Sequence, residues 1–145
     1  MINNPEKPTS VERVVIYADG ASLGNPGLAA IGATVRDEQG RLVASISQAI
    51  GRTTNNQAEY RAVIAALEEA VRLGASKANI YLDSELIVRQ INGKYRVKKA
   101  ALKPLYQQVK ELQSRFESFT ITHIPRQQNK EADKLAHIAL RGHPS

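Results

Sequence analysis

Residues 13–27 read RVVIYADGASLGNPG. The run 13–18 is apolar and rich in β-branched residues, a pattern typical of a strand that is buried on both faces. It leads into Asp19 and then into a loop that glycine and proline punctuate. An acid that follows a buried strand is either a turn residue or part of a site, and the rest of the chain bears on that choice.

The segments after this loop alternate between strand and helix patterns. Two strands, at 30–36 and 41–49, are joined by a short Gly-containing turn and predict an antiparallel hairpin. A long helix, 56–73, has apolar residues at helical spacing and is closed by a glycine. The remaining elements are a strand at 78–82, a helix at 84–91, a basic connector at 94–99, a helix at 100–116, a strand at 119–124, a loop at 125–129 and a helix at 130–140. This order predicts an α/β domain with a mixed sheet.

The length of 145 residues fits one compact domain, and the hydrophobic fraction of 42 % is ordinary for a globular protein. We expect the domain at 13–140, with a flexible N-terminal tail at 1–12 and a C-terminal tail at 141–145. No apolar run approaches the roughly 18 residues that would cross a membrane, and the N-terminus lacks the apolar core of a signal peptide.

The net charge and the cysteine count bear on the binding partner and on the cellular compartment. The net charge of +6 favours a polyanionic partner, and nucleic acid is the commonest one. The chain has no cysteine, which excludes disulfides and thiolate metal sites and is compatible with a reducing cytoplasm. We expect a cytoplasmic monomer with no membrane association and no obligate protein partner.

Three acids stand where an α/β site would be built. Asp19 and Asp83 each follow a buried strand, and Glu59 lies in the first turn of the long helix. If the two strands are parallel neighbours, both aspartates lie at the carboxyl edge of the sheet, where sites of such folds form. Carboxylates at such a short separation repel one another unless a cation neutralises them, and Mg²⁺ prefers carboxylate oxygens as ligands.

Each acid also has an ordinary structural explanation. Glu59 stands three residues after Asn56, as in a helix capping box. Asp83 precedes a helix, and Asp133 lies in the first turn of the last helix, where the helix dipole favours an acid. Asp19 precedes a glycine, as a turn residue does. Only the joint pattern of these acids favours a site.

That joint pattern resembles the type 1 ribonuclease H family. Four segments carry the resemblance, in the order and spacing of the family: YADGASLGNPG (17–27), GRTTNNQAEY (51–60), IYLDSELIVRQING (80–93) and IPRQQNKEADKLA (124–136). Together they cover nearly the whole of 13–140. The resemblance implies a ribonuclease H-like fold, which is a five-stranded mixed sheet with helices packed on it.

The resemblance also implies a reaction. Asp19, Glu59, Asp83 and Asp133 match the four catalytic and metal-binding carboxylates of the family. They would hold two Mg²⁺ ions, with Mn²⁺ able to take their place; one ion would activate a water and the other would stabilise the departing 3′ oxygen. The implied function is an endoribonuclease that hydrolyses the RNA strand of RNA–DNA hybrids and leaves 5′-phosphate and 3′-hydroxyl ends.

Other matched positions imply substrate contacts. Asn25, Asn55 and Asn56 match residues that touch the RNA strand, and an amide can both donate to and accept from a ribose 2′-hydroxyl. Arg52 and Thr54 match a pocket for a phosphate of the DNA strand. Without the resemblance, the asparagines would be taken as turn and cap residues.

The chain departs from the family pattern in its basic connector. Many members carry a helical basic handle there, whereas this chain has only the short run 94–99. We expect Lys98 and Lys99 to contact phosphates of the DNA strand, with Lys99 standing where the phosphate pocket often has an asparagine. The alternative is that these lysines are merely solvated.

The loop before Asp133 is also short. Many members place a mobile histidine there, but His123 falls inside the predicted strand FTITHI. We therefore expect a structural role for His123 in a partly buried strand. Arg126 or Gln127 would then occupy the space of the missing side chain.

Three other functions stay open at this point. A nuclease of broader specificity would also cut double-stranded RNA. A related nuclease of the integrase type would act on DNA, although the asparagine pattern argues against it. A catalytically inactive module would bind hybrids without cutting them, although the four intact acids argue against that.

Overall fold

The structure is a computed structural model, and it describes residues 11–142. Most of each predicted tail therefore lies outside the described residues. Within them, the Glu12 carbonyl accepts hydrogen bonds from the Ser76 and Lys77 amides, at 2.9 and 3.0 Å. No helix in this described range is long and apolar enough to span a bilayer.

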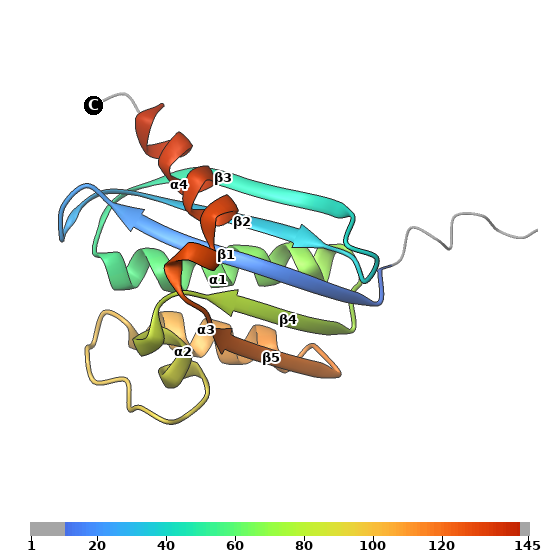
Figure 1. Cartoon of the computed structure of the whole chain (residues 1–145). Helices are drawn as coiled ribbons and strands as arrows, with labels where there is room; N and C mark the ends of the chain where they lie inside the picture. The colour runs from blue at the N-terminus through green and yellow to red at the C-terminus, as the bar shows by residue number, and fades with distance from the viewer. Residues whose placement is uncertain (1–10, 143–145) are drawn as a thin grey trace, which may run out of the picture.

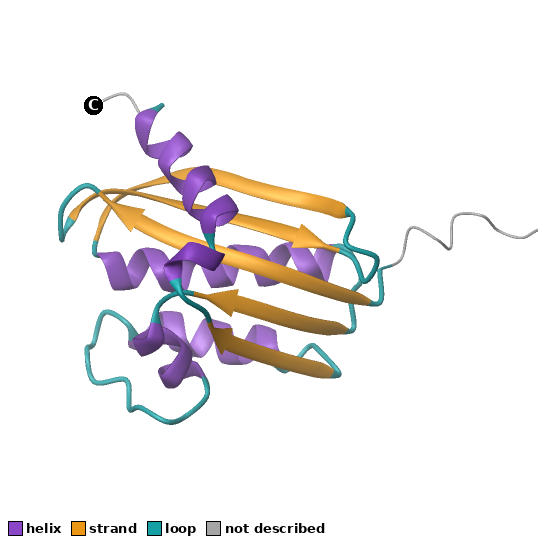
Figure 2. Cartoon of the chain, in the orientation of Figure 1, coloured by secondary structure: helices purple, strands orange, loops and turns teal. Residues whose placement is uncertain are grey.

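The described chain forms five strands, four α-helices and a 3₁₀ turn (Figures 1 and 2). The sheet has the order β3-β2-β1-β4-β5. The elements are β1 (Arg13–Ser22), β2 (Gly27–Arg36), β3 (Leu42–Thr53), α1 (Asn55–Arg72), β4 (Lys77–Leu82), α2 (Glu85–Ile91), α3 (Lys103–Gln113), β5 (Ser118–His123), η2 (Arg126–Gln128) and α4 (Lys130–Arg141).

The sheet is mixed, as the sequence predicts. β1 pairs antiparallel with β2, and β2 pairs antiparallel with β3, whereas β1, β4 and β5 are parallel to one another. Figure 1 shows α1 and α3 on one face of this sheet and α4 crossing the opposite face. The predicted element order and the five-stranded mixed sheet with helices packed on it are confirmed.

Strand β1 runs further than its sequence pattern predicts. The strand was expected to end at Asp19, but its pairing with β2 continues through Asp19↔Gly32 to Ser22↔Ala29. Asp19 is therefore a buried strand residue, and the turn explanation for it is wrong. The reason is that an antiparallel partner keeps the chain extended where local sequence alone favours a loop.

Other boundaries differ for similar reasons. Strand β3 reaches Thr53, because Gly51 adopts a positive φ of 81° at a register shift and the pairing then resumes. Helix α3 is shorter than the predicted 100–116, since it begins only at Lys103 with Pro104 in its first turn.

The core lies between the sheet and α1. Alternate residues of the central strands, among them Ile16, Val35 and Ile80, are buried there against Val63 and Leu67 of α1. Removing these apolar side chains from water is the main stabilising term for a domain of this size. The opposite face of the sheet is covered by α4 across β1, β2 and β3.

Two glycines allow helices to touch the sheet without an intervening side chain. A Cβ built on Gly20 would lie 2.3 Å from the Ala58 carbonyl carbon of α1. A Cβ built on Gly32 would lie 2.3 Å from the Ala132 carbonyl oxygen of α4. Since Gly32 pairs with Asp19 and Gly20 follows it, both helices approach the sheet beside Asp19.

Polar contacts fix α4 over this close approach. The Arg36 guanidinium donates to both carboxylate oxygens of Glu131, at 3.1 and 3.2 Å. The Ser47 hydroxyl donates to the Leu135 carbonyl at 2.6 Å. The start and the middle of α4 are thereby tied to β2 and β3.

Substituting Gly32 should separate α4 from the sheet. In Gly32→Ala the new methyl group would overlap backbone atoms, so we expect a loss of about 1–3 kcal/mol in the free energy of unfolding, measured by urea denaturation. Gly142→Ala is the matched control, because its Cβ would lie 3.5 Å from the nearest atom, an ordinary contact. Equal stability of the two variants would contradict the close packing of α4.

Candidate active site

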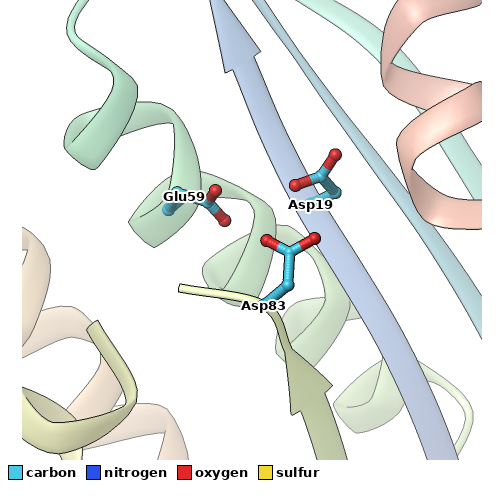
Figure 3. Close-up of side chains that lie close together, drawn as sticks. All are labelled: Asp19, Glu59 and Asp83. Carbon is cyan, nitrogen blue, oxygen red and sulfur yellow. The ribbon is translucent and has the colours of Figure 1, made fainter. Parts of the chain in front are cut away.

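Three carboxylates meet at the carboxyl end of the parallel strands (Figure 3). One oxygen each from Asp19, Glu59 and Asp83 lies within 4.8 Å of the others. The register explains why Asp19 and Asp83 meet: Ala18 is paired with Leu82, Asp19 is the next residue of β1, and Asp83 directly follows the end of β4. We refer to these three side chains as the carboxylate cluster.

Glu59 reaches the cluster from α1. It lies in the second turn of the helix, and its Oε1 accepts a hydrogen bond from the Gly20 amide at 3.3 Å. The capping-box explanation for Glu59 is wrong, because Thr54 and Gln57 form the capping box of α1. The close contact at Gly20 is what brings the helix near enough for Glu59 to face Asp19.

The cluster is electrostatically unfavourable when no cation is bound. Burial, followed by the charge of Asp83 and the neighbouring Asp133 side chain, raises the pKa of Asp19 to about 8. Burial and the charges of Asp19 and Asp83 raise the pKa of Glu59 well above its ordinary value. Arg126 opposes both shifts. Closely spaced, partly buried carboxylate oxygens of this kind are ligands that suit a hard divalent metal ion.

Asp133 stands beside the cluster rather than within it. It lies in the first turn of α4, with 36 % of its side chain exposed, and it is close enough to raise the pKa of Asp19 by hydrogen bonding and by its charge. Its carboxylate also lies 3.2 Å from Nδ1 of His137, one turn further along the helix. The fourth predicted acid is thus adjacent to the other three.

The predicted RNA-contacting asparagines lie together near the start of α1. The Asn25 side-chain oxygen accepts a hydrogen bond from the Asn55 amide at 3.0 Å. The Ser22 hydroxyl donates to the Asn55 side-chain oxygen, a contact that the sequence did not single out. Among residues 11–142 the side-chain nitrogen of Asn25 has no hydrogen-bond acceptor, so within this range it stays available as a donor.

A small pocket of about 210 Å³ adjoins these residues. It is lined by Asn25, Thr54, Asn56 and Lys99, together with neighbouring residues of α1 and of the segment before α3. Residues predicted for the RNA strand and for the phosphate pocket therefore share one cavity. Arg52, exposed on β3, and Lys98, exposed on the connector, do not line it.

His123 is the last residue of β5, as the strand assignment predicts, but it is exposed. The strand is partly buried, as expected, since Ile121 is buried while His123 at its end is exposed; the structural role of His123 stays a prediction. Arg126 and Gln127 lie in the 3₁₀ turn η2, from which Arg126 acts on Asp19 and Glu59.

Asn129 is a buried polar residue that the sequence reading passed over as part of a loop. It is 1 % exposed, and its side chain reaches both β1 and Asp83. The only sequence signal was an asparagine placed directly before a helix, which ordinarily indicates an N-cap.

Comparison with known proteins places this site in a family. The model of the family described as reverse transcriptase-like matches residues 17–139. Ribonuclease HI of Halobacterium salinarum is 42 % identical over 134 residues, which cover 92 % of this chain and 67 % of that protein. The chain belongs to the ribonuclease H family. The ribonuclease H-like fold is confirmed as well, since the structure of that archaeal enzyme matches with a TM-score of 0.88 at 43 % identity, over 90 % of this chain and 99 % of the other.

Two further family members are informative. The bifunctional protein Rv2228c of Mycobacterium tuberculosis is 46 % identical over 129 residues, which cover 88 % of this chain but only 35 % of that protein, so the chain spans about a third of this relative. LC11-RNase H1, isolated from compost, was solved in complex with an RNA/DNA hybrid; it matches with a TM-score of 0.84 at 40 % identity, over 88 % of this chain and 96 % of the other.

The raised pKa of Asp19 predicts how the stability of this ribonuclease H family member depends on pH. An unfolded Asp19 loses its proton near its ordinary value of 3.8, whereas the folded one keeps it until about 8. The folded state binds more protons between these values, so stability should fall as the pH rises through this window. In metal-free buffer we expect a smaller fall of the melting temperature for Asp19→Asn than for the parent. Parallel declines in the two proteins would contradict the assigned shift.

Proposed function

We propose that this chain is a metal-dependent endoribonuclease that hydrolyses the RNA strand of RNA–DNA hybrids, with 5′-phosphate and 3′-hydroxyl products. The observation that carries the proposal is the carboxylate cluster, together with a pocket of amide and lysine side chains at the start of α1, the helix that also carries Glu59. The solved complex of LC11-RNase H1 with an RNA/DNA hybrid supports the same substrate for this chain.

Asp19, Glu59 and Asp83 would hold Mg²⁺, with Asp133 completing the set for a second ion. The donors are all carboxylate oxygens, which fits Mg²⁺ and also Mn²⁺. When bound, two such ions supply an activated water and charge stabilisation for the departing oxygen. Because the parallel strands fix Asp19 and Asp83 side by side, the protein provides the ligands in place before the substrate arrives.

Substrate selection would come from the end of the sheet that carries the pocket. The Asn25 amide, held by its bond to the Asn55 backbone, can donate to a ribose 2′-hydroxyl, and Asn56 lines the same cavity. The Thr54 hydroxyl and the Lys99 ammonium in that cavity suit a phosphate of the DNA strand.

Arg52 and Lys98 are proposed as outer contacts. Both are exposed and lie outside the pocket, so they would meet the duplex through its phosphates, which orients the protein on the duplex without reading its sequence. Arg126 is a cation that acts on the carboxylate cluster, and we assign it to the place where many family members have a loop histidine.

A strand-labelled cleavage assay tests the proposed reaction. RNA–DNA, RNA–RNA and DNA–DNA duplexes are compared with and without Mg²⁺, and we expect Mg²⁺-dependent cutting of the RNA strand of the hybrid. Asp19→Asn should fold and bind the hybrid but lose nearly all cleavage, because a neutral amide cannot replace the shared carboxylate ligand. Cleavage by this variant within about threefold of the parent would refute the metal-ligand role.

The same assay separates the competing functions. Efficient cutting of RNA–RNA duplexes would establish a broader specificity, and efficient cutting of DNA–DNA would favour a DNA nuclease. Hybrid binding that persists in Mg²⁺ with no product would indicate an inactive binding module.

The role of Asn25 is tested by deleting hydroxyl groups one at a time. In Asn25→Asp the oxygen that accepts from Asn55 is kept while the donor is lost, so cleavage efficiency should fall roughly 2- to 10-fold, the value of one hydrogen bond. A single 2′-deoxy substitution at the contacted nucleotide should slow the parent by a similar factor and the variant no further. A deoxy substitution far from the cut site is the control. Additive losses would show that Asn25 contacts some other group.

A further inference from the structure

Asn129 connects three of the chain segments that carry the acids. Its Nδ2 donates to the Ala18 carbonyl of β1 at 2.9 Å and to Oδ2 of Asp83 at 3.3 Å, which engages both N–H groups of the amide. Its backbone carbonyl accepts a hydrogen bond from the backbone amide of Asp133 at 3.1 Å. One buried residue thus contacts Asp83, the residue before Asp19, and the backbone of Asp133.

The stability of α4 does not explain this orientation. Asn129 is the N-cap residue of α4, yet its side chain makes no capping hydrogen bond. Its Oδ1 is buried without a hydrogen-bond partner among residues 11–142. An asparagine at this position ordinarily uses that oxygen to cap the helix, and a buried acceptor without a partner is unfavourable. The side chain thus forms no capping bond and leaves Oδ1 without a partner, while its Nδ2 donates to Asp83.

We propose that Asn129 is a positioning residue, which fixes the Asp83 carboxylate and the start of α4 in the arrangement that binds metal. The inference rests on the proposed function, since it assumes that Asp83 and Asp133 are metal ligands. Hydrogen bonds to a metal-binding carboxylate orient it, and losing such a bond typically weakens metal affinity roughly 10- to 100-fold.

The chemistry of an amide suits this position. A lysine or arginine could also orient Asp83, but its charge would compete with a metal ion for the same carboxylate. An aspartate would add a further anion next to Asp83 and would have no N–H to donate. A neutral donor holds the carboxylate in place while leaving its charge for the metal.

The test compares Asn129→Ala with Asn92→Ala. Asn92 is the matched control: its Nδ2 donates to the Ile121 carbonyl of β5 at 3.1 Å and to no carboxylate in the described part of the chain. Mg²⁺ binding is measured by isothermal titration calorimetry in the absence of nucleic acid, and the melting temperature is recorded for each protein. We expect about 10- to 100-fold weaker Mg²⁺ binding for Asn129→Ala and parental binding for Asn92→Ala.

The outcomes separate the two claims. Parental Mg²⁺ affinity in a folded Asn129→Ala would overturn the positioning role while leaving the proposed function intact. If neither the parent nor Asn92→Ala binds Mg²⁺, the proposed function fails and the inference fails with it.

A measurement on the unaltered protein covers the case in which Asn129→Ala does not fold. The side-chain amide resonances of Asn129 are followed by NMR during a Mg²⁺ titration, with those of Asn92 as the reference. Because Asn129 donates to Asp83, its signals should shift over the same Mg²⁺ range as the Asp83 backbone amide, while those of Asn92 stay in place. Unmoved Asn129 signals in a protein that binds Mg²⁺ would overturn the proposal.

Discussion

The mutual repulsion of Asp19, Glu59 and Asp83 is the constraint on which the rest of the structure depends. Their oxygens lie within 4.8 Å of one another in a partly buried setting, so separation of the three side chains would lower the electrostatic energy. The fold opposes that separation with backbone geometry: the parallel register fixes Asp19 and Asp83, and the contact at Gly20 brings α1 and Glu59 against them. Energy from the apolar core therefore holds a charged site in place.

The second helix contact extends this arrangement to the other face of the sheet. Gly32, paired with Asp19, lets the backbone of α4 reach β2, and the Arg36–Glu131 ion pair fixes the start of that helix. Asp133 consequently lies beside Asp19 although it arrives from the opposite side of the sheet to Glu59. Because Gly20 and Gly32 carry no side chain, α1 and α4 can approach the sheet closely from opposite faces. Each helix thereby contributes an acid near Asp19.

Local patterns in the sequence were sufficient for the element order and the mixed sheet, because these depend on periodicity. The four acids were assigned together only through the resemblance to the ribonuclease H family, since each acid alone has an ordinary structural explanation. Local patterns were not sufficient where a distant partner decides the structure. Strand β1 continues past Asp19 because β2 pairs with it. His123 is exposed, although α2 packs against β5, because it is the last residue of an edge strand. The role of Asn129 was hidden for the same reason, since its amide donates to Ala18, 111 positions away, rather than to the helix that it precedes.

The distribution of charge explains why a positively charged protein keeps a negative site. The net charge of +6 attracts a polyanion, and Lys99 lies in a pocket on the same surface as Asn25 rather than among the acids. The groups that bond to the carboxylates are instead neutral: the Gly20 amide on Glu59 and the Asn129 amide on Asp83. Neither donor brings a positive charge that would compete with a metal ion, although burial and crowding raise the pKa of Asp19 and Glu59 and favour their protonated forms while no metal is bound. Once these carboxylates are ionised, a phosphate drawn in by the surrounding cations would be repelled by them. In the proposed function, seating the scissile phosphate and hydrolysing it would both require divalent cations, so that the same carboxylates would govern substrate binding at the cut site as well as the reaction.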